Sequence, residues 1–277
     1  MIVAEATKGH RHHEVVHDAY AWGMAQVTLT PEQIEHFGST GWLLLRDLVA
    51  VPFEEVRAEV DRLASAGDDA SWLDHYEMTD DGRRLARSED FTPHSPLLRS
   101  VLCEGPLLDV ASALLGEQAL LYKEKINYKL AGGAGFAPHQ DKPAYPYVDQ
   151  VLSVMVAIDD STEANGCLEV VHGRHQEVLL QDDRGCIAAE VVEELAWNPV
   201  EMRAGDCLFF HALTPHRSGP NTSGRDRRAL FPTYNGASEG DLRDAYYAAK
   251  REVFASSDPE AGRVRLSLIG DFQGRPA

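Results

Sequence analysis

The chain has 277 residues, of which 44% are hydrophobic and 25% are charged, with 22 Gly and 14 Pro. This composition excludes a disordered, collagen-like or disulfide-dense chain, and at roughly 150 residues per domain the length allows one or two domains. The formal net charge of −18 repels nucleic-acid phosphates, so we expect no nucleic-acid partner.

Cysteine spacing and apolar runs indicate the cellular compartment. Cys103, Cys167, Cys186 and Cys207 form no Cys-x-x-Cys pair, which favours free thiols in a reducing compartment. No apolar run reaches the roughly 18 residues of a membrane span. The N-terminus has early charges and histidines in place of the apolar stretch of a signal peptide. We therefore expect a cytoplasmic protein without a membrane partner.

The first elements along the chain are expected to be mainly helical. Residues 1–27 lack periodicity and are interpreted as a flexible N-terminal arm. Thr30, followed by Pro31 and Gln33, predicts a capped helix that stops near Gly38. Residues 68–89 are polar and contain glycine, so a loop or lid is expected there. The other predicted elements are a strand at Trp42–Leu45 and helices at Glu54–Ala66 and Pro106–Leu115.

After Gly116 the pattern changes to short β-rich segments separated by Gly, Pro, Asn and Asp. Helices followed by many short strands indicate an α+β fold whose core is a sandwich or a barrel. No segment resembles a linker, so residues 1–277 are interpreted as one domain. The predicted strands are Leu120–Leu130, Gln150–Ile158, Cys167–Val171, Asp206–Phe210 and Arg228–Tyr234, and a late helix is predicted at Asp241–Phe254.

The first chemical motif is His139-Gln-Asp141, which follows a glycine-rich stretch at residues 131–135. On a strand, alternate side chains point to the same face, so this imidazole and this carboxylate can converge. Together they supply two of the three ligands of a 2-His-1-carboxylate triad, the arrangement associated with non-haem Fe(II). Taken alone, a His-x-Asp motif is common on surface strands.

The second motif occupies residues 205–228, where a Gly-Asp turn leads into an apolar strand, a polar loop and a further strand. His211 and His216 compete for the role of third ligand, and His211 is equally consistent with a core histidine. An arginine that opens the last strand offers a bidentate fork for a carboxylate. Both Arg227 and Arg228 occupy that position.

Together these segments resemble the phytanoyl-CoA dioxygenase family of Fe(II)- and 2-oxoglutarate-dependent oxygenases over roughly residues 30–235. The family pattern is His-x-Asp, a distal His in a His-x-Ser-x-x-Asn stretch, and an Arg about eleven positions later. Residues 152–175 resemble a third family stretch, with His172 and Arg174 where the family usually has Pro and Ser. The pattern is supplied here by His139 and Asp141, by His216 with Ser218 and Asn221, and by Arg227.

The resemblance implies a double-stranded β-helix, a jelly-roll or cupin-like barrel, flanked by N-terminal helices. It implies that His139, Asp141 and His216 bind Fe(II), and that O2 and 2-oxoglutarate are co-substrates. Arg227 would hold the distal carboxylate of 2-oxoglutarate with Ser218 as partner, and Arg228 is its rival. Halogenating relatives have a small residue in place of the carboxylate, so the presence of an aspartate favours hydroxylation or a related oxidation.

The strand at residues 122–129 is lysine-rich on one face. With period two, Lys123, Lys125, Asn127 and Lys129 share that face. A solvated outer face is one interpretation. The other follows from the resemblance, because family members use this strand to contact 2-oxoglutarate and substrate. On that reading Lys123, Lys125 and Asn127 are candidate anion contacts.

Residues 140–147 are predicted to contact the substrate. Gln140 and Lys142 flank the second ligand, while Tyr145 and Tyr147 form an aromatic loop that either walls the substrate site or covers the barrel mouth. The chain looks most like bacterial members that act on small molecules, including those that hydroxylate aminoethylphosphonate-type compounds. A natural-product intermediate is the other substrate expected from the resemblance.

Two alternative functions remain open at this point. A cupin-like metalloenzyme that does not use 2-oxoglutarate would keep the triad but would not need Arg227. A non-catalytic barrel that binds a small molecule would form no succinate with any substrate.

Overall fold

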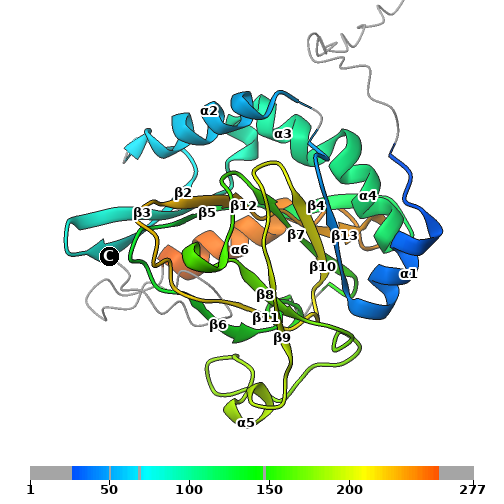
Figure 1. Ribbon diagram of the computed structural model, residues 1–277. Coiled ribbons are helices and arrows are strands. Elements are labelled where there is room, and N and C mark those ends of the chain that lie inside the picture. The colour runs from blue at the N-terminus through cyan, green and yellow to red at the C-terminus, as the bar shows by residue number, and fades with distance from the viewer. Residues whose placement is uncertain (1–26, 50, 68–69, 146–147, 256–277) are drawn as a thin grey trace, which may run out of the picture.

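The computed structural model describes residues 27–49, 51–67, 70–145 and 148–255. Its core consists of two antiparallel sheets, and several consecutive helices pack together on one side of the larger sheet (Figure 1). This arrangement confirms the predicted α+β class. Nearly all of the predicted N-terminal arm, and Tyr147 of the predicted aromatic loop, lie outside the described residues.

The first helix, α1 (Pro31–Thr40), begins as predicted. Thr30 accepts a hydrogen bond from the Gln33 backbone, and the Gln33 side chain accepts one from the Thr30 backbone. The predicted end near Gly38 is wrong, because the helix continues to Gly41, which adopts φ 86°. A Cβ atom at Gly41 would lie 2.5 Å from the His175 ring, so this turn requires glycine for both conformation and space.

The helices α2 (Phe53–Ala64), α3 (Pro96–Cys103) and α4 (Gly105–Leu115) cover the large sheet (Figure 1). Helix α2 buries Val56, Val60 and Leu63, the residues whose spacing predicted it. Helix α3 was not predicted. Ser95 followed by Pro96 could have marked the start of this helix, since serine is a favoured N-cap and proline a favoured first residue. In the structure the Ser95 hydroxyl accepts a hydrogen bond from the Leu98 backbone.

The prediction of a loop or lid at residues 68–89 is wrong. This segment contains the hairpin of β2 (Leu73–Thr79) and β3 (Gly82–Glu89), and β3 pairs with β5. Its polar composition concealed the strands because polar side chains such as Arg87 and Glu89 are buried on the inside of the fold. The hairpin therefore adds charged groups to the interior.

The larger sheet has the strand order β1-β10-β7-β12-β5-β3-β2, and β13 pairs with both β4 and β7. The predicted strand at 120–130 is divided at Glu124, and the one at 228–234 is divided at residues 231–232, which include a proline that cannot donate to the ladder. The remaining strands of this sheet are β1 (Trp42–Leu45), β4 (Ala119–Lys123), β5 (Lys125–Lys129), β7 (Val151–Ala157), β10 (Cys207–His211), β12 (Arg227–Leu230) and β13 (Thr233–Gly236).

The smaller sheet has the order β6-β11-β8-β9 and faces the larger one across the interior. Only β8, in which three of the four residues are apolar, was predicted, because β6 and β9 contain a proline and the three residues of β11 are all polar. Its register places His216 directly opposite His139. The strands are β6 (Phe136–His139), β8 (Leu168–Val171), β9 (Trp197–Val200) and β11 (His216–Ser218).

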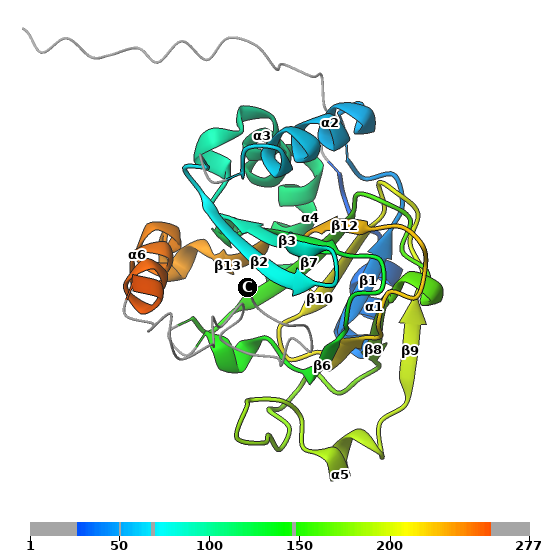
Figure 2. The same ribbon diagram turned by 90° about the vertical axis from the view of Figure 1, so that its left-hand side faces the viewer.

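The predicted late helix is present as α6 (Arg243–Ala255), which packs near β4 and stands apart from α2–α4 (Figure 2). A short helix, α5 (Ala189–Val192), precedes β9. All four cysteine thiols are free. Within the described ranges, no helix combines the length and the apolar character that crossing a bilayer requires. Short 3-10 turns occur at Thr92–His94, Lys142–Ala144, Glu163–Asn165 and Ala237–Glu239.

Candidate active site

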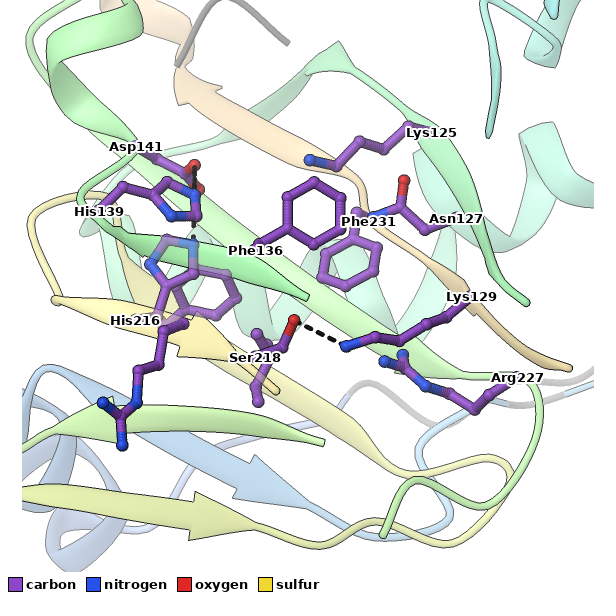
Figure 3. Close-up of a pocket in the computed structure, with 13 residues that line it drawn as sticks. Lys125, Asn127, Lys129, Phe136, His139, Asp141, His216, Ser218, Arg227 and Phe231 are labelled. Carbon is purple, nitrogen blue, oxygen red and sulfur yellow. Dashed lines mark hydrogen bonds and ion pairs between the residues drawn. The ribbon is translucent and has the colours of Figure 1, made fainter. Parts of the chain in front are cut away.

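Three potential metal ligands meet between the sheets (Figure 3). Pairing of β6 with β11 brings His139 and His216 together, and Asp141 follows β6 by two residues. Each histidine Nε2 lies 3.8 Å from Asp141 Oδ1, and the three ligand atoms are all within 4.8 Å of one another. In the described part of the chain, this is the one group of three or more such side chains that could hold a metal ion.

Hydrogen bonds fix the orientation of all three side chains. Nδ1 of His139 donates to the Ala137 carbonyl at 2.7 Å, and Nδ1 of His216 donates to the Thr214 carbonyl at 3.0 Å. Both Nε2 lone pairs are thereby left for a metal. Asp141 Oδ2 accepts a hydrogen bond from Ser153 at 2.6 Å. Burial lowers the pKa of His139 to about 3, so its imidazole is neutral, as a ligand must be, at ordinary pH.

A cavity extends from the triad to Arg227. Figure 3 shows the triad at one end of this cavity and Arg227 with Lys129 at the other, with Phe136 and Phe231 between them. We call it the Arg227 cavity. Its other lining residues are Lys125, Asn127, Leu168, Phe210, Arg217 and Ser218.

The far end of the Arg227 cavity contains two buried cationic side chains. The guanidinium of Arg227 donates to the Gly166 carbonyl at 2.9 Å, while its buried Nε has no partner among the described residues. The ammonium of Lys129 donates to Ser218 Oγ at 2.9 Å and to two carbonyl groups, those of Gly166 and Gly219. Burial lowers the pKa of Lys129 to about 7 and that of Arg227 to about 10. A carboxylate between these cations would offset their desolvation.

A second cavity opens from the same triad on the other side of Lys125. We call it the Lys123 cavity. It shares Lys125, Phe136, His139 and Asp141 with the Arg227 cavity, so both cavities reach the metal ligands. The residues that line only the Lys123 cavity are Arg87, Glu89, Lys123, Ala144, Tyr145, Tyr246 and Lys250.

The lysine face of β4 and β5 points into the interior. Lys123 and Lys129 are each less than one-tenth exposed, and Lys125 and Asn127 line the Arg227 cavity. Asn127 also accepts a hydrogen bond from Arg87 Nε at 3.0 Å. The opposite face, with Ile126 and Tyr128, belongs to the hydrophobic core. The structure thus places these lysines inside the fold, away from the solvated surface that was the other interpretation.

The competing residues of the second motif point elsewhere. His211 packs against His175, and its Nδ1 accepts a hydrogen bond from the Leu213 backbone at 3.0 Å. Arg228 forms ion pairs with Asp159 and Asp61 and lines neither cavity. Of the two arginines, Arg227 is therefore the one that reaches the site.

Two predicted substrate contacts lie outside both cavities. The side-chain amide of Gln140 makes three hydrogen bonds, to the backbones of Glu177, Leu179 and Leu213. Lys142 donates to the Tyr145 carbonyl at 3.3 Å. Gln140 therefore joins the loops around the triad. Of the predicted substrate contacts, Tyr145 does line the Lys123 cavity.

Charged or aromatic residues that line the cavities but were not selected from the sequence include Lys129, Arg87, Glu89, Tyr246 and Lys250. Lys129 shares the face of the selected lysines, so its period-two position could have identified it. Arg87 and Glu89 come from the segment expected to be a loop, and Tyr246 and Lys250 come from α6. Nothing local in the sequence shows that these four side chains turn inward.

Comparison with known proteins identifies the family. The phytanoyl-CoA dioxygenase (PhyH) family profile matches residues 37–229, more than half of the chain. The chain belongs to this family. It is a non-haem iron dioxygenase that uses 2-oxoglutarate and O2, and the triad and the anion end of the Arg227 cavity fit both groups.

Among its relatives, the methylphosphonate hydroxylase of Gimesia maris is 42% identical over 254 residues, covering 90% of this chain and 98% of the relative. The 2-aminoethylphosphonate dioxygenase of an uncultured bacterium is 42% identical over 198 residues, which cover 70% of this chain and 74% of the relative. The crystal structure of EctD from S. alaskensis with 2-oxoglutarate and 5-hydroxyectoine superposes with a TM-score of 0.68 at 22% identity, covering 81% of each chain. This likeness confirms the predicted double-stranded β-helix.

Proposed function

We propose that this dioxygenase hydroxylates a carbon atom of a small phosphonate. The reaction converts substrate R–H, 2-oxoglutarate and O2 into R–OH, succinate and carbon dioxide. The observation that carries the proposal is a metal triad between two cavities that both contain buried cations. The two phosphonate-oxidising relatives, each 42% identical, support the same substrate class.

His139, Asp141 and His216 are the proposed ligands of Fe(II), and three protein ligands leave positions open for the co-substrates. When bound, the iron supplies the activation of O2 that the oxidation of a C–H bond requires. Arg227 is the proposed partner of the distal carboxylate of 2-oxoglutarate, and Lys129 and Ser218 are its proposed neighbours. Their hydrogen bonds and burial support this assignment.

The protein's own contribution is to orient the reactants and exclude water. Phe136 and Phe231 give the middle of the Arg227 cavity an apolar wall, which separates its two charged ends. Cations at both cavities favour a dianionic co-substrate in one and an anionic substrate in the other. Because the triad lies between them, the reacting groups of both molecules would meet at the metal.

Anaerobic addition of Fe(II) and then 2-oxoglutarate tests the cofactors. We expect the weak visible charge-transfer band of the iron chelate, and we expect Arg227→Met to require much more 2-oxoglutarate to produce it. If the folded, iron-loaded protein never shows the band, the assignment of 2-oxoglutarate is wrong.

Exposure of this complex to O2 with methylphosphonate or 2-aminoethylphosphonate tests the substrate class. We expect succinate and a hydroxylated phosphonate in equal amounts, measured by chromatography and phosphorus NMR, and no product from His216→Ala. Oxidation of ectoine with no oxidation of either phosphonate would contradict the proposal.

A further inference from the structure

The Lys123 cavity contains two ammonium groups that lack an oxygen partner. Lys123 is 8% exposed, and its Nζ lies over the rings of Tyr145 and Tyr246, at 4.6 and 5.9 Å from their centroids. Lys125 Nζ lies 5.2 Å from the centroid of Phe231. Among the described residues, neither ammonium has a hydrogen bond or an ion pair. Because burial lowers the pKa of Lys123 to about 8, an anion beside it would relieve an existing cost.

The carboxylates of this cavity are already committed. Glu89 forms ion pairs with Lys250 and with Arg87 at 3.4 Å, and its Oε1 lies 3.5 Å from His75 Nε2. Asp141 belongs to the metal triad. In the described lining of the Lys123 cavity there is no further carboxylate, so an ammonium group on a substrate would find no counter-charge there.

The aromatic faces of this cavity are also occupied. Tyrosine rings can bind a ligand's ammonium group through their electron-rich faces. Here the Tyr145 and Tyr246 rings already lie against Lys123, and Tyr246 also lies 5.8 Å from Lys250 Nζ. An ammonium group of a ligand at these rings would be repelled by the lysine ammonium groups already there.

We propose that the Lys123 cavity binds the phosphonate group of an alkylphosphonate that has no ammonium group, with Lys123 and Lys125 donating to its oxygens. The cavity thereby selects alkylphosphonates over aminoalkylphosphonates. This inference rests on the proposed phosphonate hydroxylation and narrows its substrate class. Lys123 contributes twice, because it attracts the anion and occupies the Tyr145 ring, which would otherwise accept an ammonium group.

The test compares methylphosphonate with 2-aminoethylphosphonate in the wild type and in Lys123→Met. We expect the wild type to favour methylphosphonate in kcat/KM by at least about tenfold. We expect Lys123→Met to raise the KM for methylphosphonate by about 10- to 100-fold, the usual effect of losing a hydrogen bond to a charged group. The preference for methylphosphonate should also decrease, because the substitution frees the ring of Tyr145 for an ammonium group. The KM for 2-oxoglutarate should change less than about twofold, since Lys123 does not line the Arg227 cavity.

Two further variants separate a specific effect from damage to the fold. Lys123→Arg keeps the charge and should retain most of the affinity. Arg184→Met removes a cation from an exposed turn, where Arg184 pairs with Asp182, and should change neither KM. If Lys123→Met does not fold, Lys123→Gln, which removes the same charge and lies outside the Arg227 cavity, carries the same comparison.

Binding is measured separately from turnover by phosphorus NMR line broadening of methylphosphonate in the anaerobic Fe(II)–2-oxoglutarate complex. Loss of binding in Lys123→Met and retention in Arg184→Met support the inference even if oxidation proves slow. Equal turnover of both phosphonates by the wild type overturns the inference while phosphonate hydroxylation stands. Absence of turnover for every phosphonate, with binding intact, contradicts the proposed function but leaves the assignment of the cavity in place.

Discussion

The residues that face the metal triad from β4 and β5 are cationic in a protein whose net charge is −18. Lys123 and Lys129 are buried there, and burial also lowers the pKa of Lys125 well below its ordinary value. Desolvated cations destabilise a fold unless anions or lone pairs surround them. Their concentration around one triad is therefore best explained by anionic ligands.

Replacing Arg227 and its neighbour Arg228 one at a time tests which arginine binds 2-oxoglutarate. Arg227→Met should raise the KM for 2-oxoglutarate by about 10- to 100-fold, because a buried bidentate partner of a carboxylate is lost. Arg228→Met is the matched control, since its ion pairs lie outside both cavities. Steady-state succinate formation measures both variants. An unchanged KM for 2-oxoglutarate in Arg227→Met would show that another residue holds its distal carboxylate.

Lys129 should make the binding of 2-oxoglutarate depend on pH. Its pKa is lowered to about 7, first by burial and then by Arg227. An anion stabilises the protonated form and raises this pKa in the complex, so binding above pH 7 requires proton uptake. The KM for 2-oxoglutarate should therefore increase as pH rises from about 7 to 9. In Lys129→Met the KM should be higher and nearly constant over this range. A wild-type KM that is constant across it would contradict this assignment.

The spacing of the two motifs was sufficient to select His139, Asp141, His216 and Arg227, because the family resemblance links these positions to a common geometry. It could not show the role of Gln140, whose amide is saturated by backbone groups from distant loops. Such contacts depend on tertiary structure, which a local pattern does not encode.

At the scale of elements, the pairing of β6 with β11 sets the triad, and Gly135 permits it. A Cβ atom at Gly135 would lie 2.0 Å from the Ser218 carbonyl oxygen and 2.9 Å from the Gly219 carbonyl carbon. Gly135→Ala should therefore displace β11 and lower iron affinity by at least about tenfold. Iron binding is measured by titration under anaerobic conditions.

Gly132→Ala is the control for this prediction. Gly132 has φ 74°, but a Cβ atom there would have no neighbouring atom of the described residues within 4 Å, so alanine is strained without a collision. We expect a loss of about 1 kcal/mol in unfolding free energy with iron affinity unchanged. Equal iron affinity in both variants would show that the approach of β6 to β11 does not set the triad.

Helix α6 is joined to the hairpin β2–β3 by a buried ion pair between Lys250 and Glu89. Lys250→Met should lower the unfolding free energy by about 3 kcal/mol, because it leaves a buried carboxylate with fewer partners. The double variant Lys250→Met/Glu89→Gln should recover part of this loss. Chemical denaturation of the four proteins in the cycle measures the coupling. If the two single losses simply add in the double variant, this pair does not stabilise the contact between α6 and the hairpin.

Elements with an apolar period or a cap were predictable, whereas the polar hairpin was not. The cap at Thr30 and the spacing of Val56, Val60 and Leu63 each identified a helix. The hairpin at residues 73–89 was misread because its strands bury charged groups, the reverse of the usual pattern. A strand that faces a charged ligand site need not alternate in hydrophobicity.

On the scale of the whole molecule, the site depends on both sheets. The smaller sheet supplies the two histidines, and the larger one supplies Arg227 and the lysines. Ligands that contact both sheets therefore bind the folded chain and not the unfolded one. Such binding must stabilise the entire fold by linkage.

This linkage predicts a large thermal shift. Fe(II) and 2-oxoglutarate at about 100 times their dissociation constants each add about 2.7 kcal/mol, and for a chain of this size each should raise Tm by about 5 °C. Anaerobic calorimetry measures the shift with each ligand alone and with both. In His139→Gln the shift from iron should be lost, whereas in Arg227→Met iron should still stabilise the protein and 2-oxoglutarate should add little. If 2-oxoglutarate stabilised Arg227→Met as strongly as the wild type, its carboxylate would have to bind elsewhere, and a site shared between the two sheets would be wrong.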